Sequence, residues 1–339
     1  MPSNARTRSL VTSRGDFAVV DMASDSSTHP VGTVVMVPGF MGSKEDFLPM
    51  LLPLGRAGYR AVAIDGRGQH ETGGFHPPTA YAREELARDL VAVVDALDAG
   101  PVHLLGHSYG ALLARVAVLQ TQGDTSLWRS MTLMNFGPAQ VSELQRDRLN
   151  LLISVLDTMT LEDIWPYLDI QDTAPSDDVR DFMRSRWVAN DPNHVKAAAE
   201  HLLTELDSTA TLATLKLPKA IVSGSPDLTW DPDGVTNGAR PLLLGGTDRR
   251  HSSDTTPSDE SPEDVSHAGG GSEAASQVSS RAGRLAFSGA VGQARTFRVL
   301  TTTPLGVVPQ SYSSLLAALW PRRLPVCPLV TVKIQQSRR

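Results

Sequence analysis

The sequence predicts an α/β protein built on a mostly parallel sheet with helices on both faces. Short apolar runs rich in β-branched residues alternate with longer segments of helical periodicity, the pattern of buried parallel strands joined by crossover helices. The chain has 339 residues, enough for one large domain with an insertion. The predicted strands are Phe17–Asp21, Thr33–Val37, Arg60–Ile64, Val102–Leu105, Met131–Met134 and Lys219–Ser223.

Two of the connecting segments carry clear helical signals. Between Tyr81 and Ala99 apolar residues recur every three to four positions, and Gly100 ends the pattern. The segment after Ser108 shows the same spacing. The apolar positions are Leu86, Leu90, Val93, Val94 and Leu97 in the first helix and Leu112, Leu113, Val116 and Leu119 in the second.

The strand–helix alternation stops between about residues 137 and 217, where only helices are predicted. An all-helical insertion between two late strands suggests a lid over a pocket, and we expect its aromatic residues either to face that pocket or to form the lid's own core. We therefore divide the chain into a first core part (1–136), the lid (137–217), a second core part (218–245) and a low-complexity, disordered tail (246–339). The aromatic and soft residues are Trp165, Tyr167, Phe182, Met183 and Trp187.

The amino-acid composition limits which kinds of molecule this protein is expected to bind. A net charge of −6 and a pI near 5.8 argue against nucleic acid. No apolar run approaches the roughly 18 residues that span a bilayer, and the N-terminus lacks the apolar core of a signal peptide. Cys327 is the single cysteine, so no intramolecular disulfide forms. We expect a cytoplasmic protein with a small-molecule substrate, no cofactor and no metal, and the sequence leaves its oligomeric state open.

Residues Val102–Ala114 are the most informative segment of the chain. An apolar run ends in Gly106-His107-Ser108-Tyr109-Gly110, and a helical pattern follows at once. A serine at the apex of so sharp a strand–turn–helix takes a strained conformation, and glycine at both flanks lets strand and helix pack closely. The Tyr109 N–H lies at the helix N-terminus, where an oxyanion would form. The pattern predicts that Ser108 is a nucleophile.

A second oxyanion donor is predicted after the strand that ends at Val37. There Pro38-Gly39-Phe40 turns toward a helix that begins near Ser43, and the N–H of Phe40 can join that of Tyr109. Ser43 and Asp46 have the spacing of a helix capping pair.

These motifs resemble those of the α/β-hydrolase superfamily, in this order along residues 16 to 230. They are Pro38-Gly39-Phe40, the Asp65-Gly66-Arg67-Gly68 turn, the Gly106–Gly110 elbow and Gly224-Ser225-Pro226-Asp227. The resemblance implies an α/β-hydrolase fold in which Asp227 is the acid that orients the base. It also implies a structural rather than a catalytic role for Asp65 and Arg67, although Asp227 has the alternative of capping a helix.

The sequence differs from the family pattern at the catalytic base. The resemblance places a histidine after a last strand, which Pro241–Leu244 can supply, and this indicates His251 as the base. His267 is a weaker candidate, and a third alternative is that no competent base exists. The composition changes abruptly after Trp230, as it would if the coding sequence left its original frame near residue 231.

The other histidines have structural interpretations. His107 is expected to pack beside the nucleophile or line the pocket, and His103 to be buried on its strand. No histidine pair shows metal-ligand spacing supported by a carboxylate.

The sequence therefore predicts a serine hydrolase that cleaves a small, largely apolar carboxylic ester through an acyl-enzyme. The resemblance implies that epoxide opening or dehalogenation would need a carboxylate at the elbow. Amide, lactone and carbon–carbon bond hydrolysis stay open. The alternative is a catalytically impaired protein of this fold that binds a small hydrophobic ligand, and a weaker one makes the Ser/Thr/Asp-rich segment a docking or regulatory tail.

Overall fold

The computed structural model describes residues 2, 4–25, 29–74, 76–137, 141–168, 174, 176–225, 296–301 and 331–334. These residues form a nine-stranded sheet in the order β1-β2-β4-β3-β5-β6-β7-β8-β9. The strands are β1 (Ala5–Thr12), β2 (Gly15–Met22), β3 (Gly32–Val37), β4 (Tyr59–Ile64), β5 (Val102–His107), β6 (Trp128–Met134), β7 (Lys219–Ser225), β8 (Thr296–Thr301) and β9 (Thr331–Ile334).

The centre of the sheet is parallel, as predicted. Strands β4, β3, β5, β6 and β7 run parallel to their neighbours, whereas β1 and β2 form an antiparallel hairpin at one edge and β2 pairs antiparallel with β4. All six predicted strands are confirmed. The carboxyl ends of the parallel strands meet at one edge, the usual position of ligands in such sheets.

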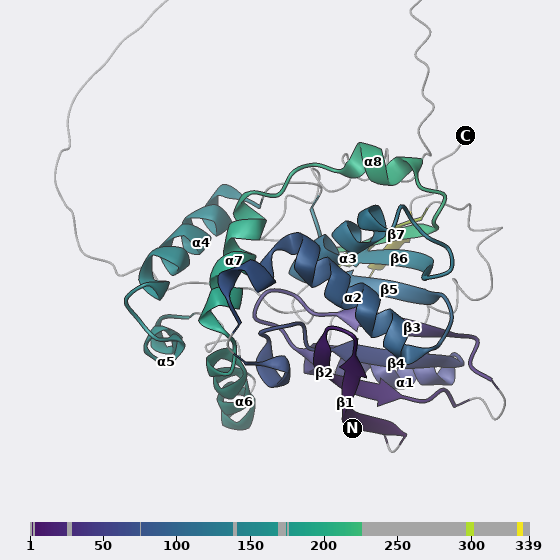
Figure 1. Cartoon of the computed structure of the whole chain (residues 1–339), viewed down its shortest axis with the longest axis horizontal. Coiled ribbons are helices and arrows are strands. Elements are labelled where there is room, and N and C mark those ends of the chain that lie inside the picture. Colours follow the sequence, from purple (N-terminus) through teal and green to yellow (C-terminus); the bar gives the residue numbers. More distant parts are fainter. Residues whose placement is uncertain are drawn as a thin grey trace, which may run out of the picture.

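Helices cover both faces of the sheet (Figure 1). Val35 and Val37 of β3 belong to the core beneath α2 and α3, and the intervening Val34 and Met36 belong to the core beneath α1. This two-residue alternation explains why the central strands are largely apolar. The helices are α1 (Leu48–Arg56), α2 (Arg83–Leu97) and α3 (Tyr109–Gln120), with short 3₁₀ turns at Lys44–Phe47, His70–Thr72 and Pro78–Tyr81.

The predicted insertion lies between β6 and β7 and is helical in its described residues. Helices α4 to α7 gather beside one end of the sheet (Figure 1). They are α4 (Glu143–Leu156), α5 (Leu161–Ile164), α6 (Asp177–Val188), α7 (Pro192–Leu203) and α8 (Thr209–Thr214), with a 3₁₀ turn at Trp165–Tyr167. None of the described helices is long and apolar enough to cross a membrane.

Three strands were not predicted. Strand β1 escapes detection because five of its eight residues are polar and only Leu10 is buried. Strands β8 and β9 fall inside the region expected to be a disordered tail, so that expectation is corrected at these residues. Strand β8 pairs antiparallel with β7, and β9 pairs parallel with β8. The rest of residues 246–339 lies outside the described part of the chain.

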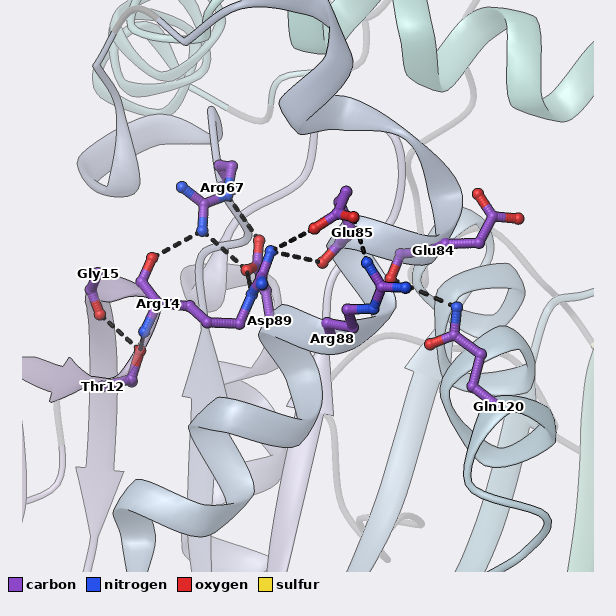
Figure 2. Close-up of polar contacts among 9 residues, drawn as sticks. All are labelled: Thr12, Arg14, Gly15, Arg67, Glu84, Glu85, Arg88, Asp89 and Gln120. Atoms are coloured by element: carbon purple, nitrogen blue, oxygen red, sulfur yellow. Dashed lines mark hydrogen bonds and ion pairs between the residues drawn. The ribbon is translucent and has the colours of Figure 1, made fainter.

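A polar network fixes the β1–β2 hairpin to α2 (Figure 2). Asp89 of α2 is buried and accepts hydrogen bonds from Arg14 in the hairpin turn (2.6 Å) and from Arg67 (2.7 and 2.8 Å). Arg67 also donates to the carbonyl oxygen of Arg14 (2.8 Å). Arg67 therefore has a structural role, as the sequence analysis expected for the Asp65–Gly68 turn.

Candidate active site

Ser108 lies at the junction between β5 and α3, at the carboxyl edge of the sheet. Its backbone has φ 50° and ψ −116°, a conformation that costs a non-glycine residue free energy. Its N–H donates to the carbonyl oxygen of Met134 (2.9 Å), and its own carbonyl accepts from Ala111 in the first turn of α3 (2.9 Å). The surrounding hydrogen bonds hold the strained turn in place, and the side chain is only partly buried.

The glycines on either side of Ser108 are required by space. A Cβ at Gly106 would lie 2.4 Å from the carbonyl oxygen of Gly110. A Cβ at Gly110 would lie 2.3 Å from the carbonyl oxygen of Val37. Real Cβ atoms do not approach backbone oxygens so closely, so the elbow tolerates no side chain at either position.

The loop after β3 packs directly on the elbow. A Cβ at Gly39 would lie 3.3 Å from the Cβ of Ser108 and 3.1 Å from Nδ1 of His107. The loop turns tightly, because the N–H of Gly42 donates to the Gly39 carbonyl (3.0 Å). Phe40 follows Gly39 within this turn, so the predicted oxyanion residues Phe40 and Tyr109 come from two segments in contact. Their roles as donors stay a prediction.

Gln69 fixes this loop and was missed in the sequence. Its side-chain amide donates to the Gly39 carbonyl (3.0 Å), while its amide oxygen accepts from the N–H of Gly66 (2.9 Å). Gln69 is 3 % exposed. One buried side chain therefore joins the turn after β4 to the loop that carries Phe40, and no local sequence signal distinguishes it from other turn residues.

A buried cation lies beneath the same loop. The Lys44 ammonium is fully buried and pairs with Asp65 (2.8 Å), Glu45 (2.9 Å) and Glu71 (2.6 Å). Burial lowers the pKa of Lys44, but hydrogen bonds to Asp65 and Glu71 outweigh it and hold that pKa above its usual range. Asp65 thus neutralises a lysine, in agreement with a structural role.

The described residues include one group with metal-ligand chemistry, Glu45, His70 and Glu71, whose potential ligand atoms lie within 4.8 Å of one another. The two carboxylates of this group already pair with Lys44. The positive charge of the Lys44 ammonium already balances these carboxylates and would repel a metal ion, so this group is a poor cation site.

His107 is packed into the interior beside the elbow. It is 7 % exposed, and burial lowers the pKa of its imidazole, with the Asp46 carboxylate opposing the shift. Its Nδ1 faces the Gly39 backbone. His103 is also buried and bonds Ser130 (2.7 Å), as the sequence interpretation expected.

The aromatic residues of the lid divide between two settings. Trp165 and Trp187 are buried in the core, and the Trp187 indole donates to the Leu161 carbonyl (2.5 Å). Tyr167 is half exposed. The Phe182 ring meets the His70 ring edge-on at 5.9 Å, which brings α6 against the turn after β4. The tryptophans therefore belong to the hydrophobic core that the lid shares with the sheet and with helices α2 and α3.

The lid also bonds to the loop that follows β3. Arg186 of α6 donates to Asp46 (2.5 Å) and to the Ser43 hydroxyl (3.3 Å). Asp46 in turn accepts from the Ser43 N–H (3.2 Å), as predicted for a capping pair. The structure thus brings together Ser108, Tyr109, Phe40 and the lid. The predicted acid and base, Asp227 and His251, lie outside the described residues, as does the alternative His267.

Comparisons with known proteins agree with this geometry. A family model described as the alpha/beta hydrolase fold matches residues 32–166. Epoxide hydrolase 3 of Siraitia grosvenorii is 38% identical over 87 residues, which are 26% of this chain and 27% of that protein. The match therefore spans about a quarter of the relative's length.

Solved structures match over most of the chain. A thermophilic esterase from Thermogutta terrifontis has a TM-score of 0.53 at 20% identity, covering 70% of this chain and 87% of its own. An epoxide hydrolase from Vigna radiata has a TM-score of 0.50 at 19% identity, covering 66% and 80%. At these identities the similarity shows the fold alone. The family model, these structures and the strained serine elbow with its two flanking glycines agree, so the chain has the α/β-hydrolase fold.

Proposed function

We propose that this protein is a serine hydrolase that cleaves a small, largely apolar carboxylic ester. One observation carries the proposal: Ser108 occupies a strained turn between β5 and α3, with the Gly39–Phe40 loop packed against it. A serine held in that conformation beside two candidate backbone donors is the arrangement that acyl transfer needs. A small-molecule substrate and a cytoplasmic location are part of the proposal.

In the proposed mechanism, Ser108 Oγ attacks the ester carbonyl carbon while His251 accepts its proton. The N–H groups of Phe40 and Tyr109 hold the oxyanion, and Asp227 orients the histidine. The carbon–oxygen bond to the alcohol then breaks, and His251 returns the proton to the leaving group. Water, activated by the same histidine, hydrolyses the acyl-enzyme and regenerates Ser108.

Strand pairing supports the choice of acid and base. Strand β7 ends at Ser225, and the antiparallel β8 begins at Thr296, which pairs with Ser225. The chain between these residues leaves and re-enters the sheet at the edge that carries Ser108, because β7 lies parallel to β6 and β6 to β5. Asp227 and His251 both belong to that connection.

The nucleophile separates this proposal from epoxide opening, the activity in the name of the Siraitia relative. The resemblance implies a carboxylate nucleophile for epoxide opening, and the elbow of this chain carries a serine. We therefore propose acyl transfer and assign epoxide hydrolysis no part in it.

Labelling with a fluorophosphonate probe tests the proposal, because such probes phosphonylate a serine that its base activates. Wild type, Ser108→Ala, Asp227→Ala and His251→Ala are compared, with Ser9→Ala on the exposed face of β1 as a control. We expect wild type and Ser9→Ala to label and hydrolyse p-nitrophenyl butyrate, and the other three variants to lose both. Styrene oxide is the comparison substrate.

Each contrary result has a definite meaning. Labelling that survives His251→Ala moves the base elsewhere, with His267→Ala as the next variant. A well-folded wild type that neither labels nor hydrolyses the ester contradicts the proposal and favours the binding protein with an incomplete triad. Hydrolysis of styrene oxide in preference to the ester would contradict the assigned reaction.

A further inference from the structure

The side chain of Tyr109 links the nucleophile elbow to lid helix α7. It is 1 % exposed, and its hydroxyl lies 2.9 Å from Nδ1 of His201. The two rings stack with centroids 6.1 Å apart and an interplanar angle of 20°. His194, seven residues before His201 and so on the same face of α7, meets the Tyr109 ring at 6.2 Å. Tyr109 therefore contacts two successive turns of the lid helix.

His201 is suited to accept a hydrogen bond from the Tyr109 hydroxyl. Burial, followed by the nearby charge of Arg83 and by His194, lowers the pKa of His201 to about 3. The imidazole is therefore neutral at pH 7, and with its proton on Nε2 the Nδ1 atom accepts the Tyr109 O–H. Burial also raises the pKa of Tyr109, so the phenol stays protonated and remains the donor.

The core holds both ends of α7. At its C-terminal end, Arg83 of α2 donates to the His201 carbonyl (3.2 Å). At its N-terminal end, the N–H of Asp191, the residue that caps α7, donates to the Gly68 carbonyl (2.9 Å). Because His201 is itself held by the backbone of a fixed helix, it can fix the position of Tyr109 in turn.

The position of Tyr109 matters because its N–H is the first of α3. The first N–H groups of a helix have no acceptor within that helix and are available to a ligand. A displacement of the Tyr109 side chain that carried its Cα along would move the Tyr109 N–H, next to Ser108, whose backbone is already strained at φ 50°. An oxyanion donor acts strongly only when it is preorganised.

We propose that the Tyr109–His201 hydrogen bond positions the Tyr109 N–H as an oxyanion donor, which makes His201 of the lid helix a positioning residue for catalysis. The proposal rests on the proposed function. It predicts a kinetic effect that a merely structural bond would not have.

A second tyrosine supplies the matched control. Tyr81, like Tyr109, is buried, bonds α7 through its hydroxyl and packs against His194, at 5.6 Å. It is distant in sequence from the nucleophile and carries no proposed donor. Tyr109→Phe and Tyr81→Phe therefore both remove one hydroxyl bond from α7, and only the first concerns the elbow.

The experiment measures kcat and KM for p-nitrophenyl butyrate, the rate of fluorophosphonate inactivation, and the melting temperature. We expect Tyr109→Phe and His201→Leu each to lower kcat and the inactivation rate about tenfold, with KM changed less than about twofold. The double variant should lose no more than either single variant, because both remove one bond. His201→Asn, whose amide oxygen can replace Nδ1 as acceptor, should regain part of kcat.

Tyr81→Phe should lower the melting temperature with kcat close to wild type. The inference is overturned if Tyr109→Phe leaves kcat unchanged, or if the two phenylalanine variants lower kcat equally. A wild-type chain that does not react with the probe overturns the proposed function and this inference with it. A reactive wild type beside an unaffected Tyr109→Phe overturns this inference alone.

Discussion

The side-chain amide of Gln69 donates a 3.0 Å hydrogen bond to the carbonyl oxygen of Gly39, the residue that packs against Ser108. The same side chain accepts a bond from the Gly66 N–H. Gln69 lies on the turn after β4 and Gly39 on the loop after β3, so this bond ties two neighbouring loops at the carboxyl edge of the sheet. The loop with the proposed donor Phe40 is thus held by a buried side chain that is not one of the proposed catalytic residues.

Replacement of Gln69 should therefore affect activity. Gln69→Met keeps the size of the side chain but leaves the Gly66 N–H without this acceptor, at a cost of about 1 to 3 kcal/mol, and leaves the Gly39 carbonyl held only by the Gly42 N–H. We expect kcat for the ester to fall about tenfold in the folded variant. Gln120→Met, which removes an exposed bond at the end of α3, is the control and should match wild type. Equal kcat in both variants would contradict the role given to Gln69.

Gly110→Ala should destabilise the protein by about 3 kcal/mol or more, because its Cβ would meet the carbonyl oxygens of Val37 and Pro38 at 2.3 and 2.4 Å. Gly100→Ala is the comparison: it has open space but a φ of +67°, so it should cost only about 1 kcal/mol. Urea unfolding of both variants measures the difference. Similar losses would mean that the elbow relaxes to admit a side chain.

His194 should make the fold sensitive to acid. Burial lowers the pKa of His194 from 6.5 to about 4, with Asp191 opposing the shift. The unfolded chain then binds a proton near pH 6.5 and the folded chain only near pH 4. Stability is therefore unaffected above pH 6.5 and falls, by about 3 kcal/mol for this group, as the pH drops from 6.5 to 4.

His194→Phe tests this effect. Neither ring nitrogen of His194 has a hydrogen-bond partner among the described residues, and the ring packs edge-on against Tyr81 and Tyr109. Phenylalanine should therefore stabilise the protein already at pH 7 and more strongly at pH 5, as measured by urea unfolding at several pH values. A variant less stable than wild type at pH 7 would show that the imidazole has a partner.

Asp89 should be the critical residue of the network in Figure 2. It is 2 % exposed and pairs with both Arg14 and Arg67, so Asp89→Asn removes the carboxylate that pairs with Arg67 and leaves Arg14 paired only with Glu85. We expect a loss of about 2 to 4 kcal/mol in the free energy of unfolding. Arg88→Gln, one residue earlier on α2, breaks only an exposed pair with Glu85 and should stay within about 0.5 kcal/mol of wild type.

The elements that hold the site could be predicted from local patterns. The strand before Ser108, the helix after it and the insertion between β6 and β7 follow from apolar periodicity and from glycine spacing. Those signals are strong because every residue of β5 is buried, and because a Cβ at Gly106 or Gly110 would collide with the backbone.

The contacts that connect the site to its surroundings could not be predicted. Gln69 and Gly39 are 30 residues apart in sequence, and Tyr109 and His201 are 92 apart, so no local periodicity relates them. Strands β8 and β9 were missed because their apolar runs are short and interrupted by polar residues. The identity of the base depends on residues beyond Ser225, where composition alone gave no pattern.

The backbone of Ser108 makes function and stability compete at a single residue. Glycine adopts a φ of 50° without the penalty that serine incurs, so Ser108→Gly should yield a chain that is inactive and yet harder to unfold. Selection for stability alone would therefore favour glycine over serine at this position. The proposed function gives the hydroxyl in this turn its purpose.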